Sequence, residues 1–238
     1  MPERVLGVAS RFATLSIEQK RGLYERAAEL FSDNKRALFD RLAPLRTRHI
    51  SVVLEDVYQS HNAAAVLRSC DCFGVQDVHV VEAHNRFNPA GDVAVGSSKW
   101  VDYYRHGTIA DAYCHLRERG YRIVATLPHE DDQMITDLDI SQKTALVFGT
   151  ELTGLTPEAI EGADAYVKVP MYGFTESFNI SVCAALCLFT LTERMRASAD
   201  IDWRLDDEGL LDLKLHWAMQ AIRDGERVMQ ELLECLSV

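Results

Sequence analysis

Three short segments of this sequence combine amides, hydroxyls, glycines and one arginine at spacings that could support chemistry. The first, at 60–70, reads SHNAAAVLRSC and places Asn62 and Arg68 in a helical pattern. Because a helical side chain leans toward the N-terminus of its helix, the Arg68 guanidinium should lie over small alanines that leave room for a ligand. From this segment alone, an arginine that binds an anion and an N-capped helix with a surface arginine are equally good interpretations.

The second segment, at 148–155, reads FGTELTGL and leaves an apolar strand through a turn with two glycines. Loops at the carboxyl ends of parallel strands are where such sheets bind ligands. The glycine spacing matches a P-loop, but Leu155 and Thr156 stand where that motif needs Lys and Ser or Thr, which disfavours a nucleotide triphosphatase. The alternative is a strand-to-helix turn whose glycines only satisfy backbone geometry.

The third segment, at 169–182, reads VPMYGFTESFNISV and joins a strand to a very apolar helix. The free N–H groups at the start of that helix could bind a carboxylate or a phosphate. The alternative is an ordinary helix cap by Ser177 or Asn179.

Several familiar kinds of site have no counterpart in the sequence. No G-x-G-x-x-G follows the first predicted strand and no G-x-S-x-G is present, which disfavours an ordinary dinucleotide fold and an α/β-hydrolase. The pairs Cys70-x-Cys72 and Cys183-x₃-Cys187 lack zinc-site spacing, so we expect core thiols and no metal. Six scattered cysteines suit a reducing compartment, and neither a signal peptide nor a bilayer-spanning run is evident, so we expect a cytoplasmic protein without a membrane partner.

Short apolar strands alternate with helices from residue 50 onward. This alternation predicts an α/β fold, with a parallel sheet covered by helices on both faces. Strands are expected over 50–54, 78–81, 122–127, 144–148 and 166–169, and helices over 60–73, from 108 to a stop at 120, from 156, and over 179–196.

Helical patterns flank this domain on both sides. Ser16 and Gln19 have the spacing of a capping box, and Asp33 is expected to cap a second helix that ends near Pro44. The tail from Asp206 indicates one or two amphipathic helices. We therefore divide the chain into a helical extension at 1–48, an α/β domain at 49–196 and a helical tail at 197–238.

Charge is unevenly distributed along the chain, whose net charge is −11. Residues 1–48 hold ten Lys and Arg against six Asp and Glu, a net +4, so the rest carries −15. An acidic body disfavours a nucleic-acid partner, whereas the basic extension could supply the positive surface that such a partner needs. The alternative is a solvated helix face. The candidate RNA-binding cations are Lys35, Arg36, Arg41, Arg46 and Arg48.

The apolar run at 180–191 nearly encircles its predicted helix. A helix that is apolar all round must be buried on every side, and a second subunit is one way to bury it. We therefore expect a homodimer, on the evidence of Ile180, Val182, Leu186, Leu188, Phe189 and Leu191.

In this order, the three segments resemble the three motifs of the SPOUT superfamily of RNA methyltransferases, and more narrowly the TrmH-type ribose 2′-O-methyltransferases of tRNA and rRNA. The resemblance covers about 50–196 and includes N-x₅-R, F-G-x-E-x-x-G and P-M-x-G with S-x-N-x-S. The sequence GSSKW at 96–100 also matches a feature of the tRNA-modifying branch. Phe178 stands where Leu is usual, which could reshape the cofactor pocket.

The resemblance implies a deep trefoil knot in the C-terminal part of the domain, two subunits paired across the site, and S-adenosylmethionine as cofactor. It implies that the cofactor pocket is formed by Thr126, Gly149, Gly154, Val169, Met171 and Phe178. It implies that the catalytic positions are Asn62, Arg68, Glu151, Ser177, Asn179 and Ser181.

The implied reaction is attack of a ribose 2′-hydroxyl on the sulfonium methyl, in tRNA and at a D-loop guanosine. The same reaction on ribosomal RNA and a non-catalytic RNA-binding protein of this fold are the alternatives. Arg68 is the family's proposed base. Because a guanidinium in a protein stays protonated, we favour Arg68 as a group that holds an RNA phosphate and stabilises alkoxide charge, with Asn62 orienting it or the ribose.

Overall fold

The computed structural model describes residues 12, 14–57, 59–84, 96, 99–128, 133–150 and 152–236. This part of the chain forms two compact units. One is Thr47–Trp203, and the other joins the described residues before Thr47 to those from Arg204 onward. All three chemistry-bearing segments fall in the first unit.

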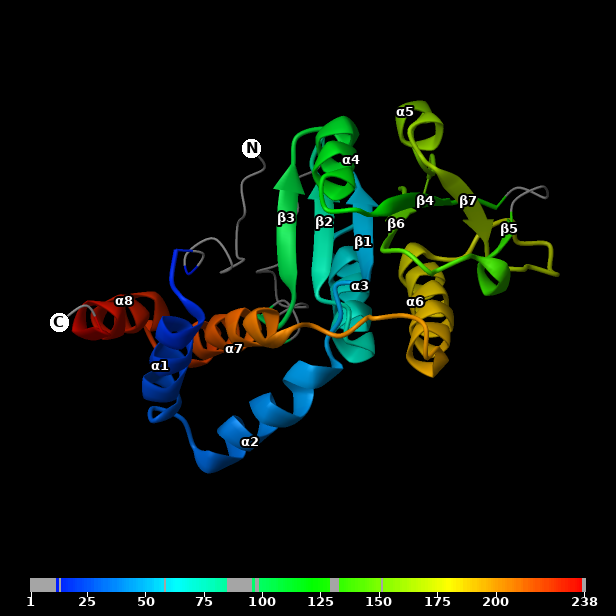
Figure 1. The fold of residues 1–238 in the computed structure, drawn as a ribbon. Helices are drawn as coiled ribbons and strands as arrows, with labels where there is room; N and C mark the ends of the chain where they lie inside the picture. The colour runs from blue at the N-terminus through cyan, green and yellow to red at the C-terminus, as the bar shows by residue number, and fades with distance from the viewer. Residues whose placement is uncertain are drawn as a thin grey trace. The chain divides into compact units, whose positions relative to one another are not determined.

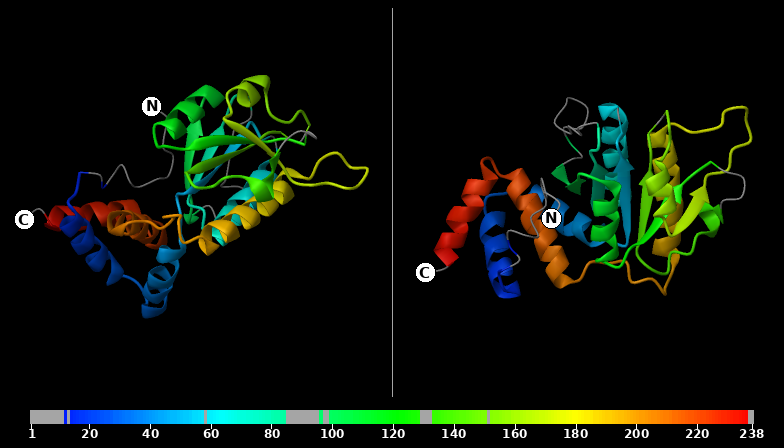
Figure 2. Two further views of the ribbon diagram at one scale, coloured as in Figure 1. Left: turned by 45° about the vertical axis from the view of Figure 1, so that its right-hand side comes forward. Right: turned by 90° about the horizontal axis from the view of Figure 1, so that it is seen from above.

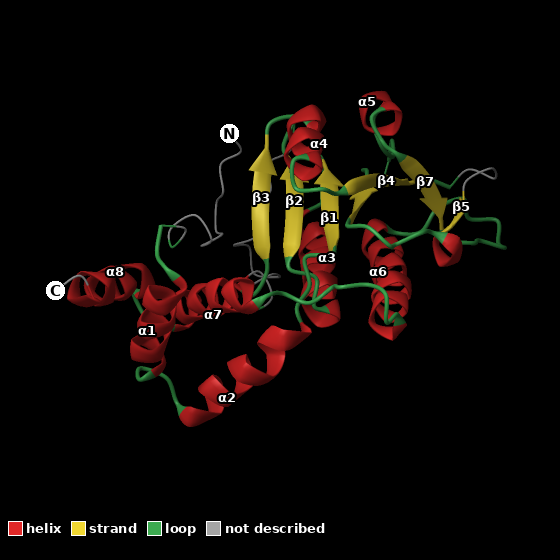
Figure 3. Ribbon diagram, viewed as in Figure 1, coloured by secondary structure: helices red, strands yellow, loops and turns green. Residues whose placement is uncertain are grey.

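A parallel β-sheet forms the centre of the first unit (Figure 1, Figure 3). Its seven strands lie in the order β3-β2-β1-β6-β4-β7-β5, and every adjacent pair runs parallel. The strands are β1 (Ile50–Glu55), β2 (Asp77–Val81), β3 (Asp102–His106), β4 (Arg122–Thr126), β5 (Gln133–Met134), β6 (Thr144–Phe148) and β7 (Ala165–Lys168).

Helices cover both faces of this sheet (Figure 1, Figure 2). They are α3 (Ser60–Phe73), α4 (Ile109–Arg117), α5 (Pro157–Glu161) and α6 (Ile180–Ala197). Helices α3 and α6 pack on the face that carries Val52 and Leu54, whereas α4 and α5 pack on the face that carries Val53. Since side chains alternate across a strand, continuously apolar strands such as ISVVLE at β1 supply the core of both layers.

Local sequence sets the ends of these helices. Gly74 ends α3 in the left-handed region at φ 76°, which glycine adopts without a side-chain clash. Thr108 caps α4 by accepting a hydrogen bond from Asp111 N at 3.1 Å, and Thr156 caps α5 by accepting one from Ala159 N at 3.2 Å. Each cap satisfies a backbone donor that the first helical turn leaves unpaired.

The predicted α/β fold with a parallel sheet and helices on both faces is confirmed. Each strand and helix predicted between 50 and 196 is present, with ends shifted by a few residues at most. Strands β3 and β5 are additional to the prediction. β3 reads DYYRH and lacks an apolar run, and β5 has two residues, so neither produces a periodic signal.

Helix α6 has two different apolar faces. Its buried face packs in the core through Ala184, Leu188 and Leu191. Its other face leaves Val182, Leu186 and Phe189 exposed at 47%, 38% and 55%. Although α6 is apolar, no helix among the described residues is long and apolar enough to cross a membrane.

The second unit is helical and combines the two ends of the chain. It contains α1 (Ile17–Ala28), α2 (Asp33–Leu42), the 3-10 helix η2 (Ala43–Leu45), α7 (Asp207–Ala221) and α8 (Gly225–Leu236). Lys20 on α1 is 2% exposed, and its ammonium lies 2.6 Å from Glu208 and 2.9 Å from Asp212 on α7. Phe39 of α2 packs against Trp217 of α7 with ring centroids 5.3 Å apart. The extension and the tail, which the sequence presents as separate parts, therefore fold together.

Of the two helix caps predicted in the extension, one is present as predicted and the other is shifted by one residue. Ser16 and Gln19 form the predicted capping box, with both reciprocal hydrogen bonds present. The prediction that Asp33 caps α2 is wrong by one residue, because Ser32 accepts the hydrogen bond from Lys35 N. Asp33 instead lies in the first turn, where a negative charge suits the helix dipole.

The strand order brings three loops to one place. β6, β4 and β7 are neighbours and run in the same direction, so their carboxyl ends share one edge of the sheet. The segments that follow Thr126, Phe148 and Lys168 therefore begin side by side, although they are far apart in the sequence.

Candidate active site

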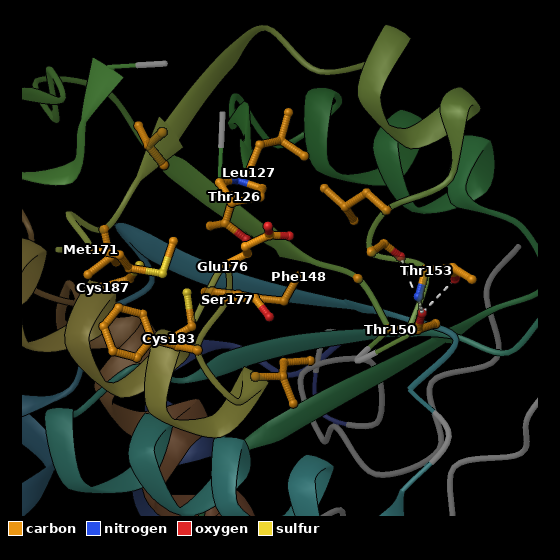
Figure 4. A pocket seen from close by; sticks show the side chains of 18 of the residues that line it. Thr126, Leu127, Phe148, Thr150, Thr153, Met171, Glu176, Ser177, Cys183 and Cys187 are labelled. Atoms are coloured by element: carbon orange, nitrogen blue, oxygen red, sulfur yellow. Dashed lines mark hydrogen bonds between the residues drawn. The ribbon is translucent and has the colours of Figure 1, made fainter. Parts of the chain in front are cut away.

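A cavity of about 380 Å³ lies at the shared carboxyl edge of β4, β6 and β7 and is closed by the start of α6 (Figure 4). All six residues predicted to hold the cofactor line it, namely Thr126, Gly149, Gly154, Val169, Met171 and Phe178. The tertiary structure thus gathers these positions from three separate loops and one helix start. Cofactor binding by them stays a prediction.

The turn after β6 requires glycine at both of its glycine positions. A Cβ on Gly149 would lie 2.2 Å from the backbone carbon of Gly154 and 2.3 Å from the nitrogen of Leu155. Gly154 itself has φ 69°, in the left-handed region. The backbones of Thr150 and Gly154 exchange two hydrogen bonds, at 3.0 and 3.1 Å. The glycines therefore shape one wall of the cavity through close backbone approach.

Side chains of the same turn reinforce it. The hydroxyls of Thr150 and Thr153 lie 2.7 Å apart, and Thr153 N donates to Thr150 Oγ1 at 3.1 Å. Figure 4 shows this pair at one side of the cavity. Glu151, a predicted catalytic position, lies outside the described residues.

Glu55, at the end of β1, positions the far end of this turn. Its carboxylate accepts hydrogen bonds from Thr156 N at 2.9 Å and from Thr156 Oγ1 at 2.7 Å, and the side chain is 3% exposed. The sequence analysis does not identify Glu55, because a single acid at the end of an apolar strand gives no local signal. Its partner lies 101 residues away in the chain.

The third segment joins the cavity to α3. Asn179 is the N-cap of α6, as one interpretation of the sequence expects, and its Oδ1 accepts from Ser181 N at 2.9 Å and Ser181 Oγ at 2.6 Å. The other end of the Asn179 amide donates to Asn62 Oδ1 at 3.2 Å, and Asn62 in turn donates to Gln59 Oε1 at 3.2 Å. Ser177 lines the cavity itself. Four predicted catalytic residues thus lie at the linked N-terminal ends of α3 and α6 or beside them.

Arg68 occupies a different surface from these residues. It lies on the exposed side of α3 together with His61, whereas Asn62 is buried at 4% exposure. Arg68 is not among the residues that line the cavity of its own chain. One chain therefore brings together the predicted cofactor residues and the asparagine–serine network, but it does not place Arg68 in the cavity wall.

The cavity wall also includes Glu176, which the sequence analysis does not single out. Figure 4 shows its carboxylate near Thr126 and Ser177. Most of the remaining lining is apolar, and among the described residues Glu176 is the one charged side chain in the wall. Thr126 is fixed in the wall because its hydroxyl donates to Val147 O at 2.8 Å.

The five predicted RNA-binding cations separate into two groups. Arg36 and Arg41 are exposed on α2, and Lys35 beside them is half-buried. Arg46 is 4% exposed, with its guanidinium 5.7 Å from the centre of the Trp217 ring. Arg48 pairs with Asp77 and lies 2.6 Å from Asp102.

Arg46 and Arg48 therefore do not form the solvated basic face that their position in the sequence suggests. Both guanidinium groups are committed to internal contacts that neutralise or bury their charge. The sequence could not separate them from their neighbours because Asp77, Asp102 and Trp217 are distant in the chain.

The expectation that the paired cysteines are core thiols holds for Cys70 and Cys187, which are buried. It is wrong for Cys72, which is exposed, and for Cys183, which is half-buried and lines the cavity. Among the described residues no three His, Cys, Asp or Glu side chains are grouped as metal ligands.

A parallel sheet that gathers three loops around a cavity at its carboxyl edge defines an α/β protein with a small-molecule site. The chain belongs to the SpoU rRNA Methylase family, whose sequence model matches residues 49–189. It is 41% identical over 180 residues to a tRNA (guanosine(18)-2′-O)-methyltransferase from Borreliella burgdorferi, covering 76% of this chain and 82% of the relative.

Solved structures agree with this assignment. The TrmH/SpoU tRNA modifying enzyme of Aquifex aeolicus superposes with a TM-score of 0.70 at 27% identity, covering 80% of this chain and 98% of that one. The SpoU methyltransferase AviRb from Streptomyces viridochromogenes, solved in complex with AdoMet, shares the fold with a TM-score of 0.57 at 21% identity, covering 66% and 62%.

We predict that Gly149→Ala abolishes binding of S-adenosylhomocysteine, because the added methyl group would overlap the backbone of Gly154 and force the turn away from the cavity. Calorimetric titration measures this directly. Gly107→Ala is the matched control, since a Cβ there meets only Asp111 Oδ2 at 4.0 Å. A Gly149→Ala protein that binds with unchanged affinity would show that the turn does not shape the site.

Proposed function

We propose that this protein transfers a methyl group from S-adenosylmethionine to the ribose 2′-hydroxyl of a D-loop guanosine in tRNA. The observation that carries the proposal is the convergence of the loops after β4, β6 and β7 on one cavity. The 41% identity to a tRNA (guanosine(18)-2′-O)-methyltransferase supports tRNA, and this nucleotide, as the substrate.

The cavity suits the cofactor in size and charge. Its volume of 380 Å³ falls within the range of about 300–1,000 Å³ that small-molecule sites occupy. Thr126, Gly149 and Met171 would hold the cofactor, and Glu176 would face its positive charge. When bound, S-adenosylmethionine supplies an electrophilic methyl group on a sulfonium.

Arg68 supplies positive charge to the RNA. A guanidinium stays protonated, so it stabilises the negative charge that develops on the 2′ oxygen as the hydroxyl attacks. The same group holds a phosphate of the RNA backbone, and the hydroxyl proton leaves through that phosphate. Because methyl transfer is a displacement between two positioned reactants, correct placement is most of what the protein contributes.

Asn62 and Asn179 act as positioning residues. Their direct hydrogen bond joins the start of α3, which carries Arg68, to the start of α6, which closes the cavity. Ser181 completes the cap and leaves Asn179 with a single amide orientation, since Oδ1 must accept and Nδ2 must donate. The network thereby holds the helix of Arg68 against the helix that bounds the cofactor.

The active unit is a homodimer. Val182, Leu186 and Phe189 form an exposed apolar stripe on α6, and Phe73 of α3 extends it, with ring centroids of Phe73 and Phe189 6.2 Å apart. Exposed apolar patches of this kind mark protein interfaces. A second copy on this stripe would approach the exposed side of α3, so Arg68 would act on the cavity of the partner.

The domain is threaded as a trefoil knot. Support comes from the motif resemblance and from the strand order, in which β6 lies between β1 and β4 while β7 lies beyond β4, so that the connection from β6 to β7 passes across β4. A crystal structure of the complex with S-adenosylhomocysteine tests the threading and the cofactor position together.

Helix α2 contributes to tRNA binding. Lys35, Arg36 and Arg41 form its cationic surface, whereas Arg46 and Arg48 make internal contacts and are left out of this proposal. A protein of net charge −11 needs such a local positive surface to hold a polyanion.

We predict that Arg68→Ala lowers single-turnover methyl transfer to tRNA by at least about a hundredfold, as loss of a transition-state charge donor does. Binding of S-adenosylhomocysteine should be unchanged, because Arg68 does not line the cavity. Transfer from labelled cofactor into tRNA and into ribosomal RNA is compared in the same assay. Near wild-type turnover by the variant would refute the role of Arg68, and labelling of ribosomal RNA alone would refute the substrate.

If the site is shared between subunits, two inactive variants should complement one another. Co-expressed Arg68→Ala and Gly149→Ala chains are purified through two different affinity tags. The mixed dimer has one complete site and should be far more active than either variant alone, whereas a site built within one chain gives no recovery. A monomeric mass with full activity would contradict the dimer.

We expect that reversing charge at Lys35, Arg36 and Arg41 to Glu weakens tRNA binding and flattens its salt dependence, since each lost phosphate contact removes about one unit of the log–log slope. Filter binding over a range of salt concentrations measures both effects. Arg223→Glu, an exposed cation outside α2, is the control. A folded triple variant with an unchanged slope would show that α2 does not contact tRNA.

A further inference from the structure

Two thiols lie in the wall of the cavity, and the proposed reaction uses neither of them. Cys183 and Cys187 both belong to α6 and both line the cavity. Their spacing of four residues puts them on the same side of the helix. Figure 4 shows the two side chains next to one another, beside Met171.

The two cysteines differ in accessibility. Cys187 is 1% exposed and belongs to the core, whereas Cys183 is half-buried with its side chain at the cavity. A reagent that enters the cavity therefore meets Cys183 first. The accessible thiol and its buried neighbour form a pair rather than a single cysteine.

Local electrostatics favour the reactive form of Cys183. The Cys187 thiol donates a hydrogen bond to Cys183 Sγ, which lowers the pKa of Cys183 although its burial acts in the opposite direction. The same bond and burial raise the pKa of Cys187, which therefore keeps its proton. Cys183 is also the fourth residue of an 18-residue helix, where the helix dipole stabilises a thiolate.

We propose that Cys183 is a site of reversible S-thiolation by small disulfides, and that its modification and occupancy of the cavity by cofactor exclude one another. In the exchange step the Cys183 thiolate attacks one sulfur of the disulfide. A new S–S bond forms, the original S–S bond breaks, and the released thiolate takes up a proton from water. The added group extends into the cavity, so a small thiol that reverses the exchange also reopens the site. This inference rests on the proposed function only in naming the competing ligand.

The test treats the full-length protein with bis(2-hydroxyethyl) disulfide and follows each cysteine by peptide mass spectrometry. Cys183 should gain one 2-hydroxyethylthio group while Cys187 stays unmodified. With S-adenosylhomocysteine at about 100 times its Kd, only about one site in a hundred is empty, so modification of Cys183 should slow roughly a hundredfold. Cys114 and Cys235, which are exposed and do not line the cavity, are internal controls and should keep their rates.

Calorimetry gives the reciprocal measurement. Modified protein should lose binding of S-adenosylhomocysteine, and dithiothreitol should restore it. The variant Cys187→Ala removes the hydrogen-bond donor, so the pH profile of Cys183 modification should move to higher pH. Circular dichroism confirms that this variant is folded, and the wild-type measurements stand without it.

The outcomes separate this inference from the proposed function. If S-adenosylhomocysteine binds but leaves the modification rate of Cys183 unchanged, or if Cys183 stays unmodified while Cys114 reacts, the modification site is wrong and the proposed function stands. If S-adenosylhomocysteine does not bind to unmodified protein, the proposed function is wrong and the claimed exclusion is wrong with it.

Discussion

The parallel pairing of β6 with β4, and of β4 with β7, is the constraint on which the rest of the site depends. Parallel neighbours end at the same edge of a sheet, so this pairing alone brings Thr126, Gly149 and Val169 to one cavity. Since β6 and the middle of β4 are buried on both faces, their register is held by apolar layers on either side, and a shift of one residue would turn core side chains to the wrong layer. β7 is held from one side, where Val167 is buried while Tyr166 is exposed. The loops can therefore be irregular and rich in glycine while the strands that carry them remain fixed.

Close backbone approach and buried hydrogen bonds then give the cavity at the carboxyl edge of the sheet its shape. Gly149 lets the turn after β6 close on Gly154, and the Glu55 carboxylate anchors the end of that turn through Thr156. A buried carboxylate left without its donors would cost more than its hydrogen bonds contribute, so the turn and the end of β1 must form together. The Asn62–Asn179 bond couples α3 to α6 in the same manner. These contacts join residues that are distant in the chain, which makes the site a property of the whole domain.

Several cations of the basic extension make internal contacts instead of facing solvent. Lys20 is buried between Glu208 and Asp212, so a cation of the basic extension is used to hold the tail rather than to face solvent. Of the three charges only the Lys20 ammonium is fully desolvated, since its side chain is 2% exposed while Glu208 is 57% exposed, so loss of its carboxylate partners would leave a buried charge without compensation. Arg46 and Arg48 likewise make internal contacts. The cationic surface of α2 is therefore smaller than the number of Lys and Arg residues in the extension suggests. Net charge by segment therefore overstates the positive potential available to RNA.

The sequence by itself determined the local elements and six of the residues that line the cavity. The capping box at Ser16, the glycine stop at Gly74 and the apolar strands are set by neighbours within a few residues, and the motif resemblance named those six positions. Only the tertiary structure decided which cations are buried and which face of α6 is exposed. It also decided that Cys183 and Cys187 line the cavity, with Cys183 the more accessible of the two, and that the helices before Thr47 and after Trp203 form one unit. The physical reason is distance along the chain. Whether a cation is buried or paired depends on partners such as Asp102, Trp217 and Glu208. Packing fixes the positions of these partners, and the residues next to the cation in the sequence do not indicate them.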